Sequence, residues 1–98
     1  YDIALIPMIN KNDSSALDKA ININKELVKN NIDSLIDDTE ENFSSKIKKM
    51  NLIGAPYQII IGKKSDGDLL EFKEIGKEIE NLTLAKIIEI IKKQKNLN

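Results

Sequence analysis

The sequence predicts an α/β domain in which a mixed sheet of four or five strands packs against three helices. Short apolar runs rich in isoleucine alternate, in the first half of the chain, with segments whose apolar residues recur at helical spacing. Strands separated by helices pair most readily in parallel, through right-handed crossovers. The later apolar runs follow one another without a helix between them, which indicates antiparallel hairpins at one end of the sheet.

The first strand and the first helix are marked by composition and by their end signals. Ile3 to Met8 is short and β-branched, which indicates a buried strand. After a polar turn at Asn10 to Asp13, Ser15 and Asp18 have the spacing of a capping box. Asn30-Asn31 ends the helix, since asparagine tolerates the left-handed conformation. The apolar residues expected on its buried face are Leu17, Ala20, Ile21, Leu27 and Val28.

The second strand and the second helix follow. Ile32 to Ile36 indicates the strand, and Phe43, Ile47 and Met50, spaced four and three apart, indicate a shorter helix. Gly54, with Pro56 just beyond, predicts where this helix ends.

The remaining strands come in direct succession. Tyr57 to Ile61 is apolar throughout and predicts the central strand. A loop with a turn at Asp66-Gly67 leads to a fourth strand, in which Leu70 and Phe72 alternate with charged residues and so leave one face in water. Gly76 predicts another tight turn, and Glu78 to Glu80 a short edge strand.

The last helix begins at a cap, either Asn81 or Thr83. Its core stripe is expected to consist of Leu84, Ile87, Ile88 and Ile91. Lysines in its final turn, among them Lys95, suit the negative end of the helix dipole.

Composition excludes several classes of site and protein. The 98 residues suffice for a single domain, 1–98, and the abrupt start at Tyr1 predicts that it was cut from a larger chain. The sequence has no cysteine and no histidine, which excludes disulfides, zinc sites built from these residues and histidine-activated nucleophiles. No apolar run approaches the roughly 20 residues of a membrane span, and no signal peptide is visible, so we expect a cytoplasmic protein without a membrane partner.

Charge is unevenly distributed in a chain whose net charge is only −1. The stretch from Phe43 to Ser65 contains no acidic residue. It contains five lysines: Lys46, Lys48, Lys49, Lys63 and Lys64. These are either ordinary solvated lysines or a surface that binds phosphates, and composition alone leaves both interpretations open.

No residue pattern in the chain resembles an active site. Asp37-Asp38 follows a predicted parallel strand and could hold Mg²⁺, but turn and helix N-terminal roles explain the pair better. Gly62-Lys63-Lys64-Ser65 lacks the spacing of a phosphate-binding loop. We therefore expect no catalytic residue, no metal site and no cofactor in this chain.

One segment carries a specific resemblance. Asp37-Asp38-Thr39, then twelve residues, then Leu52-Ile53-Gly54, Pro56 and Gln58 to Lys64 resemble the C-terminal anticodon-binding domains of bacterial prolyl-tRNA synthetases. The similarity continues into Asp68 to Lys73 and includes the first strand. It implies a five-stranded mixed sheet with three helices, the anticodon-binding fold of class II synthetases.

The resemblance also implies a partner and a division of labour. This domain would grip the anticodon loop of the tRNA for proline, whose second and third anticodon bases are guanines. A separate catalytic domain, outside this chain, would attach proline using ATP and Mg²⁺. The parent enzyme would be a homodimer through that domain, and the 98-residue chain a monomer.

Carried over by position, the resemblance assigns base contacts to Ile47 and Asn51 of the second helix, Gln58 of the third strand, and Lys64 and Ser65 of the following loop. The family often has an aromatic residue at position 47 and an acid at position 51, so this chain departs from its pattern there. Asn51 could still offer its side-chain oxygen as an acceptor. Supporting phosphate contacts are expected from Lys46, Lys48, Lys49 and Lys63.

Two other classes of function stay open. One is an accessory module of the same fold that binds a protein. The other is a small α/β enzyme or receiver using Asp37 and Asp38 with Mg²⁺.

Overall fold

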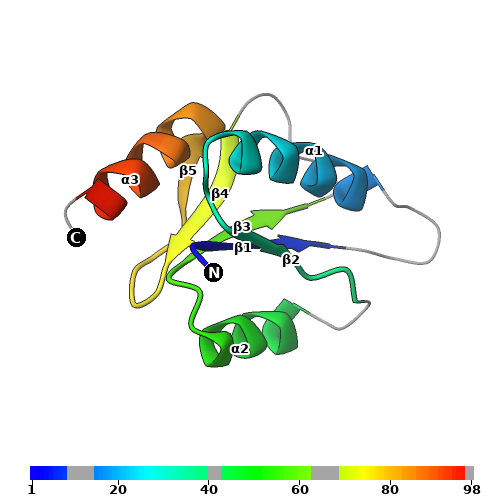
Figure 1. The fold of residues 1–98 in the computed structure, drawn as a ribbon. Helices are drawn as coiled ribbons and strands as arrows, with labels where there is room; N and C mark the ends of the chain where they lie inside the picture. Colours follow the sequence, from blue (N-terminus) through cyan, green and yellow to red (C-terminus); the bar gives the residue numbers. More distant parts are fainter. Residues whose placement is uncertain (9–14, 40–42, 63–68, 97–98) are drawn as a thin grey trace.

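The computed structural model describes residues 1–8, 15–39, 43–62 and 69–96. In chain order its elements are β1 (Ile3–Pro7), α1 (Ser15–Lys29), β2 (Ser34–Ile36), α2 (Phe43–Ile53), β3 (Tyr57–Ile61), β4 (Leu69–Glu74), β5 (Glu80–Thr83) and α3 (Leu84–Asn96). The strands form one sheet in the order β2-β1-β3-β4-β5. Figure 1 shows α1 and α3 on one face of this sheet and α2 on the other. The predicted five-stranded mixed sheet with three helices is confirmed.

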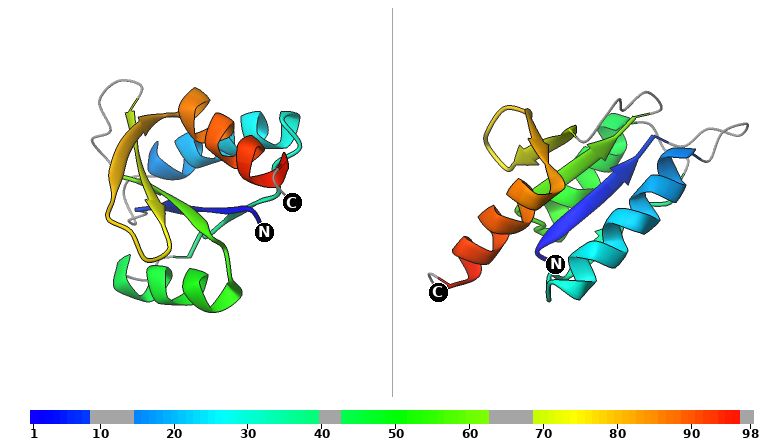
Figure 2. Two further views of the ribbon diagram at one scale, coloured as in Figure 1. Left: turned by 90° about the vertical axis from the view of Figure 1, so that its left-hand side faces the viewer. Right: turned by 90° about the horizontal axis from the view of Figure 1, so that it is seen from above.

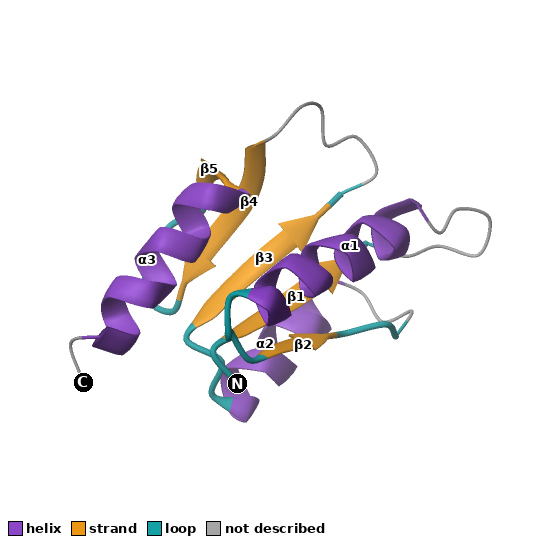
Figure 3. Cartoon of the chain, turned by 45° about the horizontal axis from the view of Figure 1, so that its top comes forward, coloured by secondary structure: helices purple, strands orange, loops and turns teal. Residues whose placement is uncertain are grey.

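The pairing follows from the connections. β1 pairs in parallel with β2 and β3, so that Ile3 lies beside Ser34 and Tyr57. The links without a helix give antiparallel pairs, β3 with β4 and β4 with β5. β3 is therefore the middle strand of the sheet, as its apolar sequence predicted (Figure 3).

The larger core lies between the sheet and the α1–α3 layer (Figure 2). Alternate residues of β1, β3 and β4 enter it, because successive side chains of a strand point to opposite faces. From the sheet these are Ile3, Leu5, Tyr57, Ile59, Ile61, Leu70 and Phe72. Ile87 and Ile91 of α3 are buried against them, as the predicted stripe required.

The buried face of α1 confirms the prediction at Ala20 and Leu27 and differs from it at the other positions. The helix buries Ala16, Ala20, Ile23 and Leu27, whereas Ile21 and Val28 are 40% and 58% exposed. Spacings of four, three and four residues keep this stripe on one line, and its small alanines let the helix approach the sheet closely. Leu17, Ile21 and Val28 were chosen for hydrophobicity, but single apolar side chains are common on protein surfaces.

Two helices end in the same capping motif, with a left-handed residue just beyond the helix. After α1, Asn31 has a φ of 60°, and the N–H of Ile32 donates to the Leu27 carbonyl at 3.0 Å. After α2, Gly54 has a φ of 87°, and the N–H of Ala55 donates to the Met50 carbonyl at 3.3 Å. Both ends are Schellman motifs, in which these bonds satisfy otherwise unpaired carbonyls.

Two predicted strands were placed slightly wrong. Ile32 is buried but belongs to the α1 cap, so β2 begins only at Ser34. The last strand begins at Glu80 rather than Glu78, because a turn occupies the residues just before it. In this turn Gly76 has a φ of 85°, and the Lys77 N–H donates to the Glu74 carbonyl. Thr83 is the cap of α3, since its hydroxyl accepts from the Lys86 N–H at 3.2 Å. The turns predicted at Asn10 to Asp13 and at Asp66-Gly67 lie outside the described residues.

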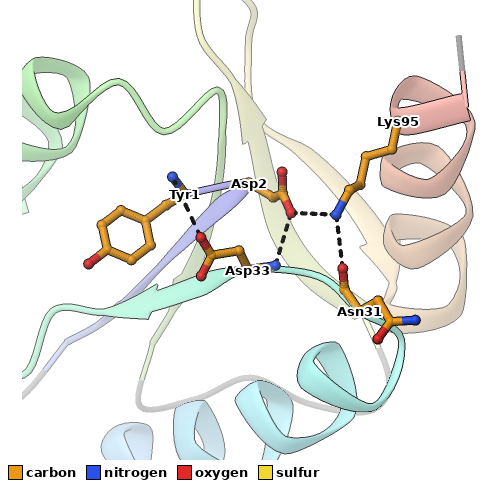
Figure 4. Close-up of polar contacts among 5 residues, drawn as sticks. All are labelled: Tyr1, Asp2, Asn31, Asp33 and Lys95. Carbon is orange, nitrogen blue, oxygen red and sulfur yellow. Dashed lines mark hydrogen bonds and ion pairs between the residues drawn. The ribbon is translucent and has the colours of Figure 1, made fainter. Parts of the chain in front are cut away.

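A polar cluster joins three segments far apart in the sequence (Figure 4). Lys95, in the last turn of α3, donates to an Asp2 carboxylate oxygen at 3.0 Å and to the Asn31 carbonyl at 2.8 Å. The Asp33 N–H donates to the same Asp2 oxygen at 2.9 Å. Burial raises the pKa of Asp2, but these bonds outweigh it and the pKa lies below its ordinary value. The cluster fixes the end of α3 to the start of β1 and to the α1–β2 turn.

In the described part of the chain, every helix is too short or too polar to cross a lipid bilayer.

Candidate nucleic-acid interface

The candidate interface is built around α2, which is held to its face of the sheet by a small apolar cluster. Four buried residues form it: Ala4, Ile6, Met50 and Ala55. Leu35 and Ile47 pack against them while staying partly exposed. The small side chains of Ala4 and Ala55 let α2 lie close to β1, so the residues along its edge have a fixed position.

Asn51 and Gln58 are joined across the gap between α2 and β3. Gln58, the second residue of β3, has a completely buried side chain, whose Nε2 donates to Asn51 Oδ1 at 3.0 Å. Its other amide atom, Oε1, is buried without a hydrogen-bond partner among the described residues. Leaving a polar atom in this state costs about 1–3 kcal/mol. An amide in a strand that is otherwise Tyr and Ile therefore calls for an explanation beyond stability.

Ile47 lies one helical turn before Asn51 on the same side of α2, because residues four apart share a helix face. Its side chain contributes to the cluster under α2 and stays partly exposed. The structure thus brings together three of the five predicted base-contact residues, Ile47, Asn51 and Gln58. Gln58 is completely buried, however, so it is not exposed for the direct base contact that was predicted. The other two, Lys64 and Ser65, lie outside the described residues, as does Lys63.

Lys46 does not belong with the predicted phosphate contacts. Its residue is only 1% exposed, and Nζ donates to the carbonyl oxygens of Pro7 at 2.9 Å and Asp37 at 3.3 Å. Those carbonyls lie where the neighbouring strands β1 and β2 end, and buried carbonyls need a donor. The ammonium group is therefore used inside the molecule and does not face a ligand.

Asp37 ties the end of β2 to α2. It is 4% exposed, and one carboxylate oxygen accepts from the Thr39 hydroxyl at 2.6 Å and from the Thr39 N–H at 3.1 Å. The Lys49 ammonium lies 3.3 Å from the other oxygen. Burial raises the pKa of Asp37. The hydrogen bonds from Thr39 and Lys49 and the charge of Lys46 outweigh burial and hold this pKa below its ordinary value.

These contacts favour the structural interpretation of Asp37-Asp38 over a Mg²⁺ site. The Asp37 carboxylate is engaged by Thr39 and Lys49, while Asp38 is exposed. Within the described ranges, the structure gathers no group of three or more residues of metal-binding type.

The lysine-rich stretch thus divides in two. Of its three described members, Lys46 is buried and Lys49, with a side chain 36% exposed, is paired with Asp37. Lys48 is exposed, as a phosphate contact would require. Two of the three described lysines, Lys46 and Lys49, therefore hold α2 in place.

The open face of β4 and β5 continues this surface, which was not predicted from the sequence. Lys73 lies directly opposite Gln58 in the antiparallel pair, and directly opposed residues share a face of the sheet. By alternation, Glu71 on β4 and Asn81 and Thr83 on β5 lie on the same face and are exposed. The signal was present, since the alternation in β4 predicted a face in water. What was missing was that this is the face covered by α2.

Comparison with known families and proteins shows what this chain is similar to. The profile of a family described as "Anticodon binding domain" matches residues 2–94. A Proline–tRNA ligase of Pelagibacter ubique is 61% identical over the whole chain, and one of Rickettsia bellii is 42% identical over 88% of it. The chain spans about a fifth of the length of these relatives, 22% and 20%.

A solved structure with the same fold is the RNA-binding domain of threonyl-tRNA synthetase from Cryptosporidium parvum. It superposes with a TM-score of 0.82 over 94% of this chain and 23% of its own. At 17% sequence identity this likeness concerns the fold.

Proposed function

The chain belongs to the anticodon-binding domain family, and we propose that it binds the anticodon loop of the tRNA for proline, as one domain of a proline–tRNA ligase. The relatives that match it from end to end, or nearly so, carry that enzyme's name. Site and family support the same kind of partner, because RNA is read on splayed single-stranded bases by side chains that meet base edges.

The observation that carries the proposal is the Asn51–Gln58 pair on the edge of α2. It holds the exposed amide of Asn51 on α2 through a hydrogen bond from β3, with Lys48 exposed on the same helix. Amides meet base edges, and lysines meet the phosphates between them. Specificity would then come from the Asn51 amide, and affinity and register from the lysines.

We assign the chemical steps of a proline–tRNA ligase to the part of the enzyme outside this chain. Activation of proline with ATP and Mg²⁺, transfer to the tRNA and homodimer formation would all belong to a catalytic domain. This chain would contribute anticodon recognition alone, as a monomer in isolation, and would work in the cytoplasm.

The test is a titration of the 98-residue chain with a proline anticodon stem-loop and with a copy in which the two shared guanines are changed. Each is measured at low and at moderate salt. Tighter binding of the guanine stem-loop that persists at moderate salt is the expected result. Equal binding of both, vanishing with salt, would contradict base recognition and leave only phosphate contacts.

Failure of both RNAs to bind at low salt would contradict the whole proposal. It would favour the accessory module that binds a protein.

Lys64, to which the resemblance assigns a base contact, offers a second check on the same complex. We expect Lys64→Ala to weaken binding to the anticodon stem-loop and to reduce the salt slope by about one charge. An unchanged salt slope would contradict a contact between the Lys64 ammonium and the RNA.

A further inference from the structure

The hydrogen-bonding groups of the Asn51 side chain are unequally used. Its Oδ1 accepts from Gln58 Nε2 at 3.0 Å. Its Nδ2 makes no hydrogen bond within the described part of the chain, and the residue is exposed. An amide nitrogen is a donor and has no acceptor lone pair. The atom that Asn51 has free for a ligand is therefore a donor.

We propose that Asn51 meets the RNA as a hydrogen-bond donor to a base acceptor, and that Gln58 is the positioning residue that sets this polarity. The inference rests on the proposed function and specifies the chemistry of one contact. It reverses the expectation carried over from the family resemblance, in which position 51 supplies an acceptor.

Gln58 is suited to this role because it cannot turn away. Its side chain is fully buried in the middle strand of the sheet, so packing fixes the position of its amide, and Nε2 points to Asn51 Oδ1. The Asn51 backbone is held within the α2 cap, where its carbonyl accepts from the Gly54 N–H at 3.2 Å. The bond between the two amides fixes which end of Asn51 points outward.

The unpartnered Gln58 oxygen supports a functional reading of this pair. Oε1 is buried without a partner among the described residues, an arrangement that lowers stability. A leucine or methionine of similar size would avoid this cost. The amide is therefore better explained by what its Nε2 does to Asn51 than by the packing of β3.

The base that suits such a donor must present an acceptor. Guanine offers O6 and N7, whereas its N1–H and amino group are donors and would need an acceptor on the protein. The two guanines of the proline anticodon thus give a direct choice. If Asn51 donates, the contact is to O6 or N7.

Guanine analogues in the proline anticodon stem-loop separate these possibilities. 7-Deazaguanine lacks N7, 6-thioguanine keeps N1–H but replaces O6 with sulfur, a weaker acceptor, and inosine lacks the amino group. At one of the two guanines we expect 7-deazaguanine or 6-thioguanine to weaken binding about threefold to tenfold, the size of one hydrogen bond, and inosine to have no effect that depends on residue 51. An inosine loss that disappears in Asn51→Ala would overturn the proposal.

Asn51→Asp tests the polarity on the protein side. Aspartate still accepts from Gln58 but has no donor to offer. We expect it to lose the analogue effect and to bind the guanine stem-loop more weakly than Leu52→Asp, which adds the same charge at an adjacent residue 89% exposed on α2. Binding by Asn51→Asp equal to or tighter than that of Leu52→Asp would show that position 51 acts as an acceptor.

Gln58→Met tests the positioning role, because it removes the amide and keeps the size of the side chain. We expect Gln58→Met alone to abolish the effect of the guanine analogues on binding. Added to Asn51→Ala, it should cause no further loss of affinity. Additive losses in the double variant would overturn positioning through Asn51. If instead wild type binds guanine and altered stem-loops equally, the proposed function itself has failed, and this outcome is distinct from all of those above.

Discussion

At the scale of single residues, Asp37 is the acid whose charge the fold uses most directly. Its lowered pKa means that the folded state prefers the ionised form. The resulting stability is fully present above the ordinary value of 3.8 and is lost as pH falls through the lower folded pKa. Acid thus removes the attachment between the end of β2 and α2.

We expect Asp37→Asn to lower the free energy of unfolding at pH 7 by about 1–3 kcal/mol, because a charge-assisted contact to Lys49 is lost inside the protein. Urea unfolding followed at several pH values measures this. The difference between wild type and variant should shrink once the pH falls below 3.8. A difference independent of pH would mean that the carboxylate charge has no part in it. Asp38→Asn, at an exposed neighbour, is the matched control.

Lys46 and Lys48 are two residues apart and have opposite roles. Lys46→Met should lower the free energy of unfolding by about 1–3 kcal/mol, because the carbonyls of Pro7 and Asp37 lose their donor. Lys48→Ala should change it by less than about 0.5 kcal/mol. In RNA titrations the order reverses, and only Lys48→Ala reduces the salt slope, by about one charge. An equal reduction by Lys46→Met would place its ammonium at the RNA.

At the scale of elements, the two helix caps make a matched pair. Asn31 has the left-handed φ of 60° at the position where Gly54 has 87°. Glycine adopts this conformation without the steric cost that a side chain incurs. Asn31→Gly should therefore raise the melting temperature slightly, because the relieved steric cost of about 1–2 kcal/mol exceeds the roughly 0.4–1 kcal/mol by which glycine's extra freedom stabilises the unfolded chain. The Asn31 carbonyl that binds Lys95 is retained, so that contact is not disturbed.

Gly54→Ala is the opposite change at the equivalent position. A β-carbon at Gly54 would have open space around it, so any loss of stability comes from φ alone. We expect a loss of about 1 kcal/mol. If Asn31→Gly fails to stabilise while Gly54→Ala destabilises, a contact of the Asn31 side chain must compensate for its strain.

The elements also show which sequence signals were sufficient. The ends of α1 and α2 were predicted because Asn31 and Gly54 are local chemical signals. The buried face of α1 was not, because choosing between Ala16 and Ile21 requires knowing where the sheet lies. For the same reason Lys46 could not be recognised as buried, since the carbonyls it satisfies belong to segments 39 and 9 residues away.

At the scale of the whole molecule, the order of strands and helices followed from periodicity and connection rules, and the site depended on what the fold brings together. Ile47 and Asn51 were predictable as neighbours on one helix. Their meeting with Gln58, and the donor polarity that results, depends on the distance between α2 and β3. No pattern in the sequence encodes that distance.

The two faces of the sheet are held by very different amounts of apolar contact. The α1–α3 face buries residues of three strands and two helices, whereas, among the described residues, the cluster between α2 and the sheet has only four buried members, Ala4, Ile6, Met50 and Ala55. Polar attachments of α2 pass through Lys46, through Lys49 with Asp37, and through the bond between Asn51 and Gln58. Regions with few buried apolar contacts open at lower free energy than the rest of a domain. The helix that carries the candidate RNA contacts is therefore the least firmly attached of the three.

Hydrogen exchange measures this difference directly. We expect amides of α2 to exchange faster than those of α1, β1 and β3, and to be slowed by the proline anticodon stem-loop. Met50→Ala should speed exchange in α2 alone, since it removes the buried side chain that α2 contributes to the small cluster. Leu27→Ala, in the larger core, should speed exchange across the whole domain. If α2 is as protected as β3 in the free protein, the polar contacts of Lys46 and Asp37 hold it as tightly as the core does. Asp37→Asn should then release it selectively.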